Sequence, residues 1–180
     1  MIMGAVLAAG AGTRYGGPKV AAERGDWLRR AVAALSDGGC DEVLVAMGAS
    51  IVEPPTRATT LVVADWADGM GATVRAVVAE GERRGADAVV MGVVDTPDVG
   101  ADVVRRVLAV ADGSRTALVR ATYGSRPGHP VYLGAEHLRG VRAVVSGDVG
   151  ARPYLDSHRD MLIDVECGDL ATGLDHDERS

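Results

Sequence analysis

Short apolar runs of strand length alternate with helical patterns along almost the whole chain. These runs are rich in Val, Ala, Leu and Met, and several of them are continuously apolar, as strands buried on both faces are. The expected strands cover residues 5–9, 43–47, 61–63, 88–94, 117–119, 131–133 and 162–165. We therefore expect an α/β protein in which helices are layered on a mainly parallel sheet.

Three segments between these runs have helical spacing and end at glycine. The segment DWLRRAVAALSDGG (26–39) starts with Asp26 as a candidate N-cap, and its last two glycines are typical of a helix end. TVRAVVAEGERRG (73–85) and ADVVRRVLAVADG (101–113) show the same pattern. Because 180 residues are too few for two ordinary domains with a linker, we expect one domain over residues 1–180.

Charge and cysteine usage exclude several classes of function. The net charge of −6 argues against the large basic surface that nucleic-acid or anionic-membrane binding needs. Cys40 and Cys167 lie far apart in sequence and have no histidine at metal spacing, so we expect two buried thiols rather than a zinc site or a disulfide. No stretch approaches the roughly 20 apolar residues of a membrane span. We expect a soluble, monomeric protein of the cytoplasm.

Ligand-binding residues in such sheets collect where the chain leaves the carboxyl ends of the strands. Four segments occupy such places: residues 10–19, 65–73 and 95–97, and the stretch LDHDE at 174–178. The first of them contains four glycines between residues 10 and 17, whose backbone N–H groups can approach an anion without a Cβ in the way. Arg14 and Lys19 add two cations, so we expect a polyphosphate ligand.

Two familiar phosphate-binding loops fit this segment less well. A Walker A loop requires Lys followed by Ser or Thr, whereas here Pro18 precedes Lys19 and Val20 follows it. Gly10, Gly12 and Gly16 approximate a dinucleotide fingerprint, and an NAD(P)-dependent oxidoreductase built on them is therefore an alternative. Against it, Pro18 falls where the fingerprint's helix should run, and the next strand lacks the acidic ribose ligand.

The motif LAAGAGTRYGGPK (7–19) resembles the signature of the MobA-like nucleotidyltransferases, most closely that of the molybdenum cofactor cytidylyltransferases. The similarity continues through VVADWADGMGATVRAVVAEGERRGADAVVMGVVDTP (62–97). It extends into the last third of the chain through RPGHPVYLG, SGDVGARPYL and CGDLATGLDHDE, in the order and spacing of the family. The resemblance implies a three-layer α/β fold, with a Rossmann-like sheet that contains one antiparallel strand. It also implies transfer of a nucleoside monophosphate from an NTP to a phosphorylated acceptor such as molybdopterin, with release of pyrophosphate.

Carried over position by position, the resemblance assigns a role to each matching residue. The nucleotide-binding residues are implied to be Leu7, Ala8, Ala9, Gly10, Gly12, Thr13, Arg14, Lys19, Asp65, Gly69 and Gly71. Arg14, Lys19 and Asp95 are implied to act in catalysis. Asp95 and Asp175 are implied to hold Mg²⁺, which prefers carboxylate and phosphate oxygens. An acceptor that is itself a phosphate needs no general base, and the sequence offers no obvious one.

The resemblance defines the nucleotide donor and the acceptor substrate less sharply than it defines the site residues. LAAG resembles the cytidine-using branch of the family, whereas the guanylyltransferases usually have LAGG, so CTP is favoured over GTP. A guanylyltransferase, another sugar or cofactor nucleotidyltransferase, and a non-catalytic nucleotide-binding relative remain alternatives, and a molybdoenzyme is a possible partner. His129 in RPGHPV is expected on the acceptor side, Trp66 in the core, and His158 at the end of a short helix. The family's D-I-D-T-P ending is replaced here by GLDHDE.

Overall fold

The computed structural model describes residues 1–177 of the chain. The last three residues of the predicted 1–180 domain, including Glu178 of the GLDHDE segment, lie outside the described residues. The strands are β1 (Ile2–Leu7), β2 (Glu42–Met47), β3 (Thr59–Val62), β4 (Ala88–Val93), β5 (Leu118–Tyr123), β6 (Arg126–Gly134) and β7 (Leu162–Glu166). All seven predicted runs are confirmed as strands, with boundaries that shift by a few residues.

The strands form one sheet in the order β3-β2-β1-β4-β6-β5-β7. β6 runs antiparallel to its two neighbours, β4 and β5, and the other pairings are parallel. The sheet is therefore mainly parallel with one antiparallel strand, as the resemblance implied. In the central pair, Leu7 of β1 lies beside Val93 of β4. This register places the segments that follow β1 and β4 next to each other at one edge of the sheet.

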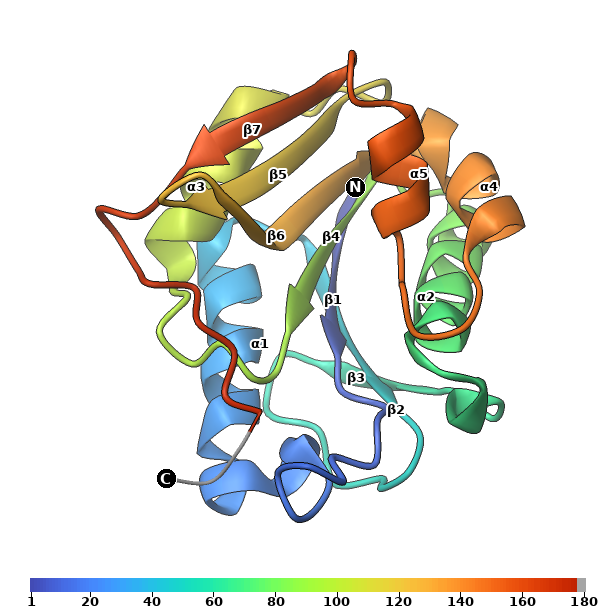
Figure 1. Cartoon of the computed structure of the whole chain (residues 1–180), viewed down its shortest axis with the longest axis vertical. Coiled ribbons are helices and arrows are strands. Elements are labelled where there is room, and N and C mark those ends of the chain that lie inside the picture. The colour runs from blue at the N-terminus through green and yellow to red at the C-terminus, as the bar shows by residue number, and fades with distance from the viewer. Residues whose placement is uncertain (178–180) are drawn as a thin grey trace.

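Helices cover both faces of the sheet and give the three-layer architecture (Figure 1). The α-helices are α1 (Asp26–Gly38), α2 (Met70–Arg84), α3 (Ala101–Ala111), α4 (Ala135–Val144) and α5 (Arg152–Ser157), and the 3-10 helices are η1 (Lys19–Gly25) and η2 (Trp66–Asp68). α1 and α3 pack on one face, while α2, α4 and α5 pack on the other. The core is built from small aliphatic side chains such as Val6, Val45, Val90 and Val119, because the chain contains no phenylalanine.

The helix ends agree with the sequence patterns except at the start of α1. α1 ends before Gly39, which has a φ of 116° as expected for a left-handed C-cap. Its N-cap, however, is Gly25, so the expectation that Asp26 caps the helix was wrong. Asp26 is the first helical residue, and its carboxylate accepts a hydrogen bond from Arg30 at 2.6 Å. Its negative charge still favours the helix N-terminus.

Other expectations for single residues can be compared directly with the structure. Cys40 and Cys167 are both buried free thiols, as predicted. His158 directly follows α5, and Trp66 packs against the core face that carries α2.

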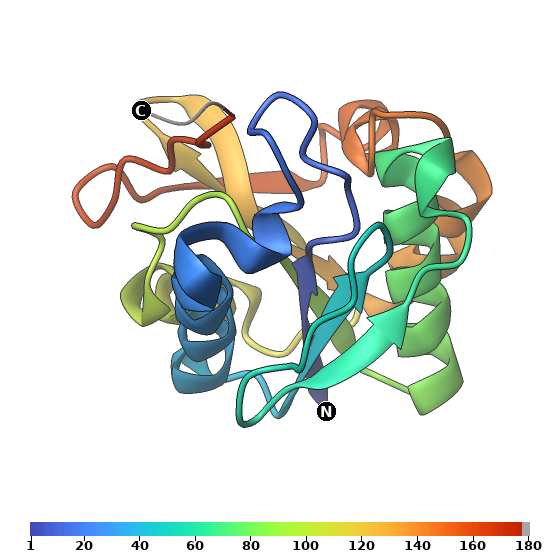
Figure 2. The same cartoon turned by 90° about the horizontal axis from the view of Figure 1, so that it is seen from below.

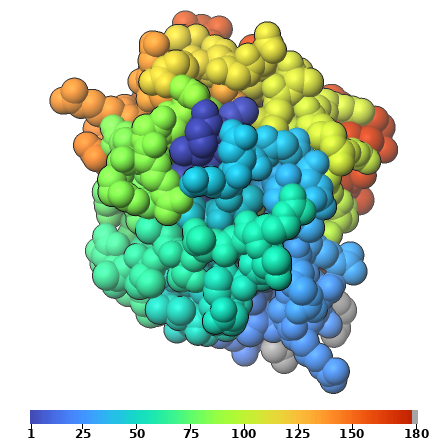
Figure 3. Space-filling model, turned by 180° about the vertical axis from the view of Figure 1, so that it is seen from behind, coloured from blue at the N-terminus to red at the C-terminus, as the bar shows by residue number. Residues whose placement is uncertain are grey.

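At the back of the molecule the N-terminus lies beside later segments of the chain (Figure 3), where the Met1 amine donates a 2.5 Å hydrogen bond to Asp87. No helix within residues 1–177 is long and apolar enough to cross a membrane.

Candidate active site

The segment after β1 turns back on itself through glycine. Gly16 and Gly17 each donate a backbone hydrogen bond of 3.0 Å to the carbonyl of Gly12. Gly12 has a φ of 60°, and a Cβ built on it would lie 2.0 Å from the Gly17 carbonyl oxygen. Only glycine fits this position, because a side chain meets both left-handed backbone and a neighbouring main chain. The turn carries Arg14 and leads directly into Lys19.

Lys19 joins three segments of the chain. Its Nζ donates to Asp95 Oδ2 at 2.7 Å and to Asp177 Oδ1 at 2.8 Å, and its side chain is 14% exposed. Burial alone would lower the pKa of Lys19, but the hydrogen bonds to the two carboxylates outweigh it and the pKa is raised. The Lys19 ammonium in turn holds the pKa of Asp177 below its usual range. Arg14 lies 3.7 Å from Asp177 and is mostly exposed.

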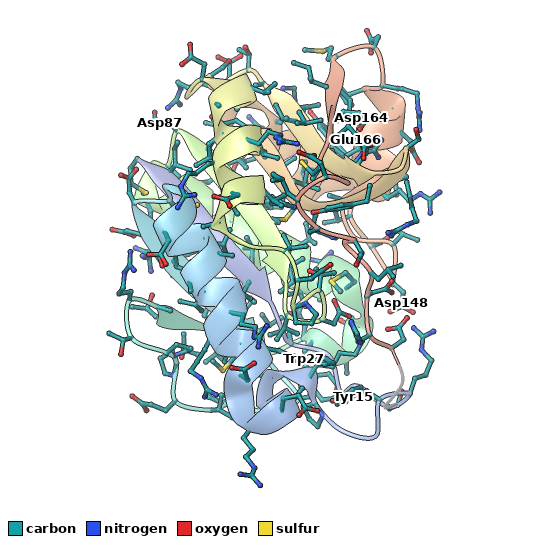
Figure 4. The ribbon with its side chains drawn as sticks, turned by 90° about the vertical axis from the view of Figure 1, so that its left-hand side faces the viewer. Tyr15, Trp27, Asp87, Asp148, Asp164 and Glu166 are labelled. Carbon is teal, nitrogen blue, oxygen red and sulfur yellow. The ribbon has the colours of Figure 1, made fainter. Side chains whose placement is uncertain are left out.

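The C-terminal segment is fastened to this centre by backbone and aromatic contacts. His176 donates its backbone N–H to the Asp95 carbonyl at 3.0 Å. The His176 ring lies 5.3 Å from the Trp27 ring, and Trp27 lies 5.2 Å from Tyr15 of the opening turn. Figure 4 shows Tyr15 and Trp27 together at the N-terminal end of α1. Figure 2 shows the C-terminal segment beside the opening turn. The opening turn and the C-terminal segment therefore meet at Asp95.

Two clefts adjoin at this point. The first, which we call the loop-side cleft, has a volume of about 620 Å³ and is lined by the opening turn, Lys19, parts of the segment 66–73 and Asp95. The second, the sheet-side cleft, has a volume of about 530 Å³ and is lined by parts of β4, β5, β6 and α5. Four residues line both clefts: Leu7, Met70, Asp95 and Asp148. Molecules bound in the two clefts would meet at these four residues.

The sheet-side cleft combines an apolar wall with cationic groups. Its apolar lining includes Val74, Met91 and Leu155. Arg120 is 5% exposed and donates two hydrogen bonds, of 2.8 and 3.1 Å, to Asp164. Arg126 donates to the Thr172 carbonyl. Arg152 lines the same cleft and is largely exposed. Asp95, Asp148 and Asp175 also line this cleft, so it offers an apolar wall together with charged groups of both signs.

His129 lines the sheet-side cleft. Burial lowers the pKa of His129, and the negative charges of Asp95 and Asp175 act in the opposite direction. Asp175 lines the same cleft as Asp95. Within residues 1–177 no group of three or more His, Cys, Asp or Glu side chains is arranged to hold a metal ion. A cation bound at Asp95 and Asp175 would thus need further ligands from substrate or water.

The structure brings most of the expected nucleotide-binding residues together. Those that line the loop-side cleft are Leu7, Ala8, Ala9, Gly10, Gly12, Thr13, Arg14, Lys19 and Gly69. Asp65 and Gly71 do not line it. Asp65 instead lies 3.6 Å from Arg75, and Gly71 donates its backbone N–H to the Gly147 carbonyl at 2.7 Å. Gly71 thus contacts the loop that follows α4 directly, whereas Asp65 contacts Arg75, which donates to the Val145 carbonyl of that loop.

Sequence reasoning assigned no role to five charged residues of the described chain that line the two clefts: Arg120, Arg126, Asp148, Arg152 and Asp177. Asp177 contacts Lys19, although Asp175 was chosen from the same segment. Asp148 lies in SGDVGARPYL, a stretch that supported the resemblance without receiving a role. Arg120 interrupts an otherwise apolar strand, and this buried charge was the available signal.

Comparison with known proteins places the chain in a defined group. Residues 4–161 match the family described as the MobA-like NTP transferase domain. A curated relative, the nicotine blue oxidoreductase of Paenarthrobacter nicotinovorans, is 34% identical over 192 residues, which cover 98% of this chain and 92% of that protein.

Solved structures share the fold at lower identity. A homologue of Rv0371c from Mycobacterium sp. strain JC1 superposes with a TM-score of 0.79 at 24% identity, over 98% of this chain and 90% of the other. Rv0371c of Mycobacterium tuberculosis H37Rv, in a complex with manganese, gives a TM-score of 0.71 at 22% identity, over 97% and 93% of the two chains.

Proposed function

Because the chain belongs to the MobA-like NTP transferase family, we propose that it transfers CMP from CTP to a phosphorylated acceptor such as molybdopterin. The observation that carries the proposal is the meeting of two clefts at Asp95. One cleft contains the glycine turn with Arg14 and Lys19, and the other has an apolar wall with arginines. This arrangement suits a triphosphate donor and an anionic acceptor that react where the clefts join.

In the proposed reaction an oxygen of the acceptor phosphate attacks the α-phosphorus of CTP. The bond from the α-phosphorus to the bridging oxygen of the β-phosphate breaks, and pyrophosphate leaves with the electron pair of that bond. Negative charge builds up on the phosphoryl oxygens, so the protein contributes mainly positioning and charge neutralisation. Lys19, Arg14 and the N–H groups of the opening turn provide that positive potential. The attacking phosphate is already anionic at neutral pH.

The residues present suit a divalent cation, and we propose Mg²⁺ with Asp95 and Asp175 as its protein ligands. Carboxylate oxygens are hard ligands, and magnesium in phosphoryl-transfer sites commonly takes one or two carboxylates together with phosphates and water. A cation held there would supply charge neutralisation for the triphosphate. Asp95 is held at the junction by Lys19 and by the backbone of His176. The manganese complex of the distant fold relative is compatible with this choice.

The choice of CTP rests on LAAG at residues 7–10, which resembles the cytidine-using branch. GTP is the alternative donor.

A second candidate function follows from the relative at 34% identity, whose name is that of an oxidoreductase. In that case Gly10, Gly12 and Gly16 would surround the phosphates of a nicotinamide dinucleotide. Binding of NADPH without magnesium, together with no binding of CTP, would favour it.

The proposal is tested by release of pyrophosphate from CTP in the presence of Mg²⁺ and molybdopterin. We expect acceptor-dependent release by the wild-type protein and a loss of about 100-fold or more in Asp95→Asn, in line with removal of a group that stabilises a charged transition state. Asp160→Asn is the matched control, because Asp160 is exposed and lies outside both clefts. Unchanged activity in Asp95→Asn would overturn the role of Asp95. Nucleotide binding without pyrophosphate release would indicate a non-catalytic relative.

A further inference from the structure

Asp148 is a carboxylate at the junction of the two clefts that the reaction described above does not use. It lies on the loop between α4 and α5 and is one of the four residues that line both clefts. Within residues 1–177 its exposed side chain forms no hydrogen bond and no ion pair. The other carboxylate that lines both clefts, Asp95, is paired with Lys19, and so is Asp177 of the loop-side cleft. Asp148 is therefore free to accept a hydrogen bond from a bound molecule.

The loop that carries Asp148 is held against the start of α2 by close contacts. Gly71 donates to the Gly147 carbonyl at 2.7 Å, and Arg75 donates to the Val145 carbonyl at 3.0 Å. A Cβ on Gly69 would lie 2.4 Å from Asp148 Oδ1, and one on Gly71 would lie 2.7 Å from the Ser146 carbonyl carbon. Residues 69 and 71 must therefore be glycine for the loop to lie this close to the start of α2. The packing of this loop against the start of α2 therefore fixes where Asp148 lies.

The charges around the loop-side cleft orient a nucleotide within it. Arg14 and Lys19 lie on and directly after the opening turn, with Asp95 and Asp177 paired to Lys19. Among residues 1–177, the wall that includes Asp148 contributes Trp66, Ala67 and Met70 to the cleft and no cation. A carboxylate repels a triphosphate and a cation attracts it, so the phosphates face the opening turn. The nucleoside part then faces the wall with Asp148. An ionised carboxylate is only a hydrogen-bond acceptor, so its partner must be an N–H or O–H group.

We propose that Asp148 accepts a hydrogen bond from the nucleoside of the bound NTP and thereby contributes to the choice of donor. This inference rests on the proposed function and adds a specificity-determining residue to it. A nucleoside offers two such donors, the exocyclic amine of the base and the ribose hydroxyls. Aspartate is a good acceptor for the amine of cytosine. Uracil has a carbonyl where cytosine has this amine, and a carbonyl cannot donate a hydrogen bond to a carboxylate. Asp148 would therefore disfavour binding of UTP.

The test is isothermal titration of the wild-type protein, Asp148→Ala and Asp160→Ala with CTP, UTP, 2′-deoxy-CTP and 3′-deoxy-CTP, all with Mg²⁺. We expect Asp148→Ala to weaken CTP binding by about 10-fold or more, as loss of a hydrogen bond to a charged group does. If the amine is the donor, the wild type prefers CTP to UTP and Asp148→Ala leaves UTP binding unchanged or stronger. If a hydroxyl is the donor, Asp148→Ala leaves binding of the corresponding deoxynucleotide unchanged. Asp160→Ala should bind like the wild type.

Two results would contradict the inference, and they differ in whether the proposed function survives. Wild-type affinity for CTP in Asp148→Ala overturns the role of Asp148 and leaves the proposed function intact. Failure of the wild type to bind any of these nucleotides overturns the proposed function and this inference with it. Gly69→Ala serves as a second variant, because its Cβ would displace Asp148 without removing the carboxylate. We expect it to reproduce the nucleotide preference of Asp148→Ala, while thermal unfolding shows that both variants are folded.

Discussion

Lys19 is the only lysine in the chain, whose other 18 cationic side chains are arginines. A compact ammonium fits between Asp95 and Asp177, where it donates to both at less than 3 Å. An ammonium is a point charge with rotatable donors, whereas a guanidinium is a planar fork. The ammonium has three N–H donors, so the two hydrogen bonds to these carboxylates leave one donor for a triphosphate oxygen.

Glu166 is a second residue whose environment is sharply defined, although it lies outside both clefts. Its carboxylate accepts hydrogen bonds from the backbone N–H groups of Gly124 and Gly168 at 2.8 Å, and from Ser125 at 3.2 Å. The Thr122 hydroxyl adds a fourth hydrogen bond at 3.0 Å. These donors hold the pKa of Glu166 at about 2. Glu166 thus joins the turn between β5 and β6 to the end of β7.

Glu166→Gln is expected to lower the midpoint of thermal unfolding by a few degrees at pH 7. A carboxylate with a lowered folded-state pKa stabilises the fold above its unfolded pKa, here about 4.3, and loses that contribution as pH falls toward about 2. The difference between variant and wild type should therefore shrink between these pH values. Glu53→Gln, at an exposed position, is the control. A difference that stays constant from pH 7 to pH 2 would contradict this role for Glu166.

Among the loops of the molecule, the opening turn depends most directly on glycine. Gly12→Ala places a Cβ 2.0 Å from a carbonyl oxygen in a left-handed conformation. We expect it to destabilise the free protein by about 1–2 kcal/mol and to expose the turn to limited proteolysis. Gly10→Ala in the same turn is the matched control, because a Cβ there meets nothing within 4 Å. Equal proteolysis and unfolding midpoints for the two variants would show that the turn does not need glycine at residue 12.

At the level of elements, the sequence was informative about strands and less so about helices and exact pairing. The strands could be predicted because buried parallel strands are continuously apolar. α4 was not predicted, although it buries His137, Leu138 and Val141 on one face. α5 was expected only as a short helix before His158. The predicted N-cap of α1, Asp26, was wrong because the preceding Gly25 takes that position. Gly25 has a φ of 80° and forms the turn into the helix without a side-chain cap. Caps depend on local backbone geometry that residue preferences describe only statistically.

At the level of the whole molecule, the candidate site joins residues that lie up to 158 positions apart, as Lys19 and Asp177 do. The resemblance led to the opening turn, Lys19 and Asp95, because their motifs are local. It could not decide which aspartate of GLDHDE meets Lys19, since that depends on how the C-terminal segment docks on Trp27 and Asp95. Asp148 was missed for a similar reason. Its place at the junction depends on contacts between the loop after α4 and the start of α2.

The most direct test of the central claim is isothermal titration of the protein with CTP, GTP, ATP and NADPH, each with and without Mg²⁺. We expect CTP to bind in a magnesium-dependent manner, and we expect Lys19→Ala and Asp95→Ala to abolish that binding. Arg139→Ala, which removes an exposed cation outside both clefts, should retain it. Binding of NADPH alone, or CTP binding that survives both substitutions, would contradict the assignment of these clefts to nucleotidyl transfer.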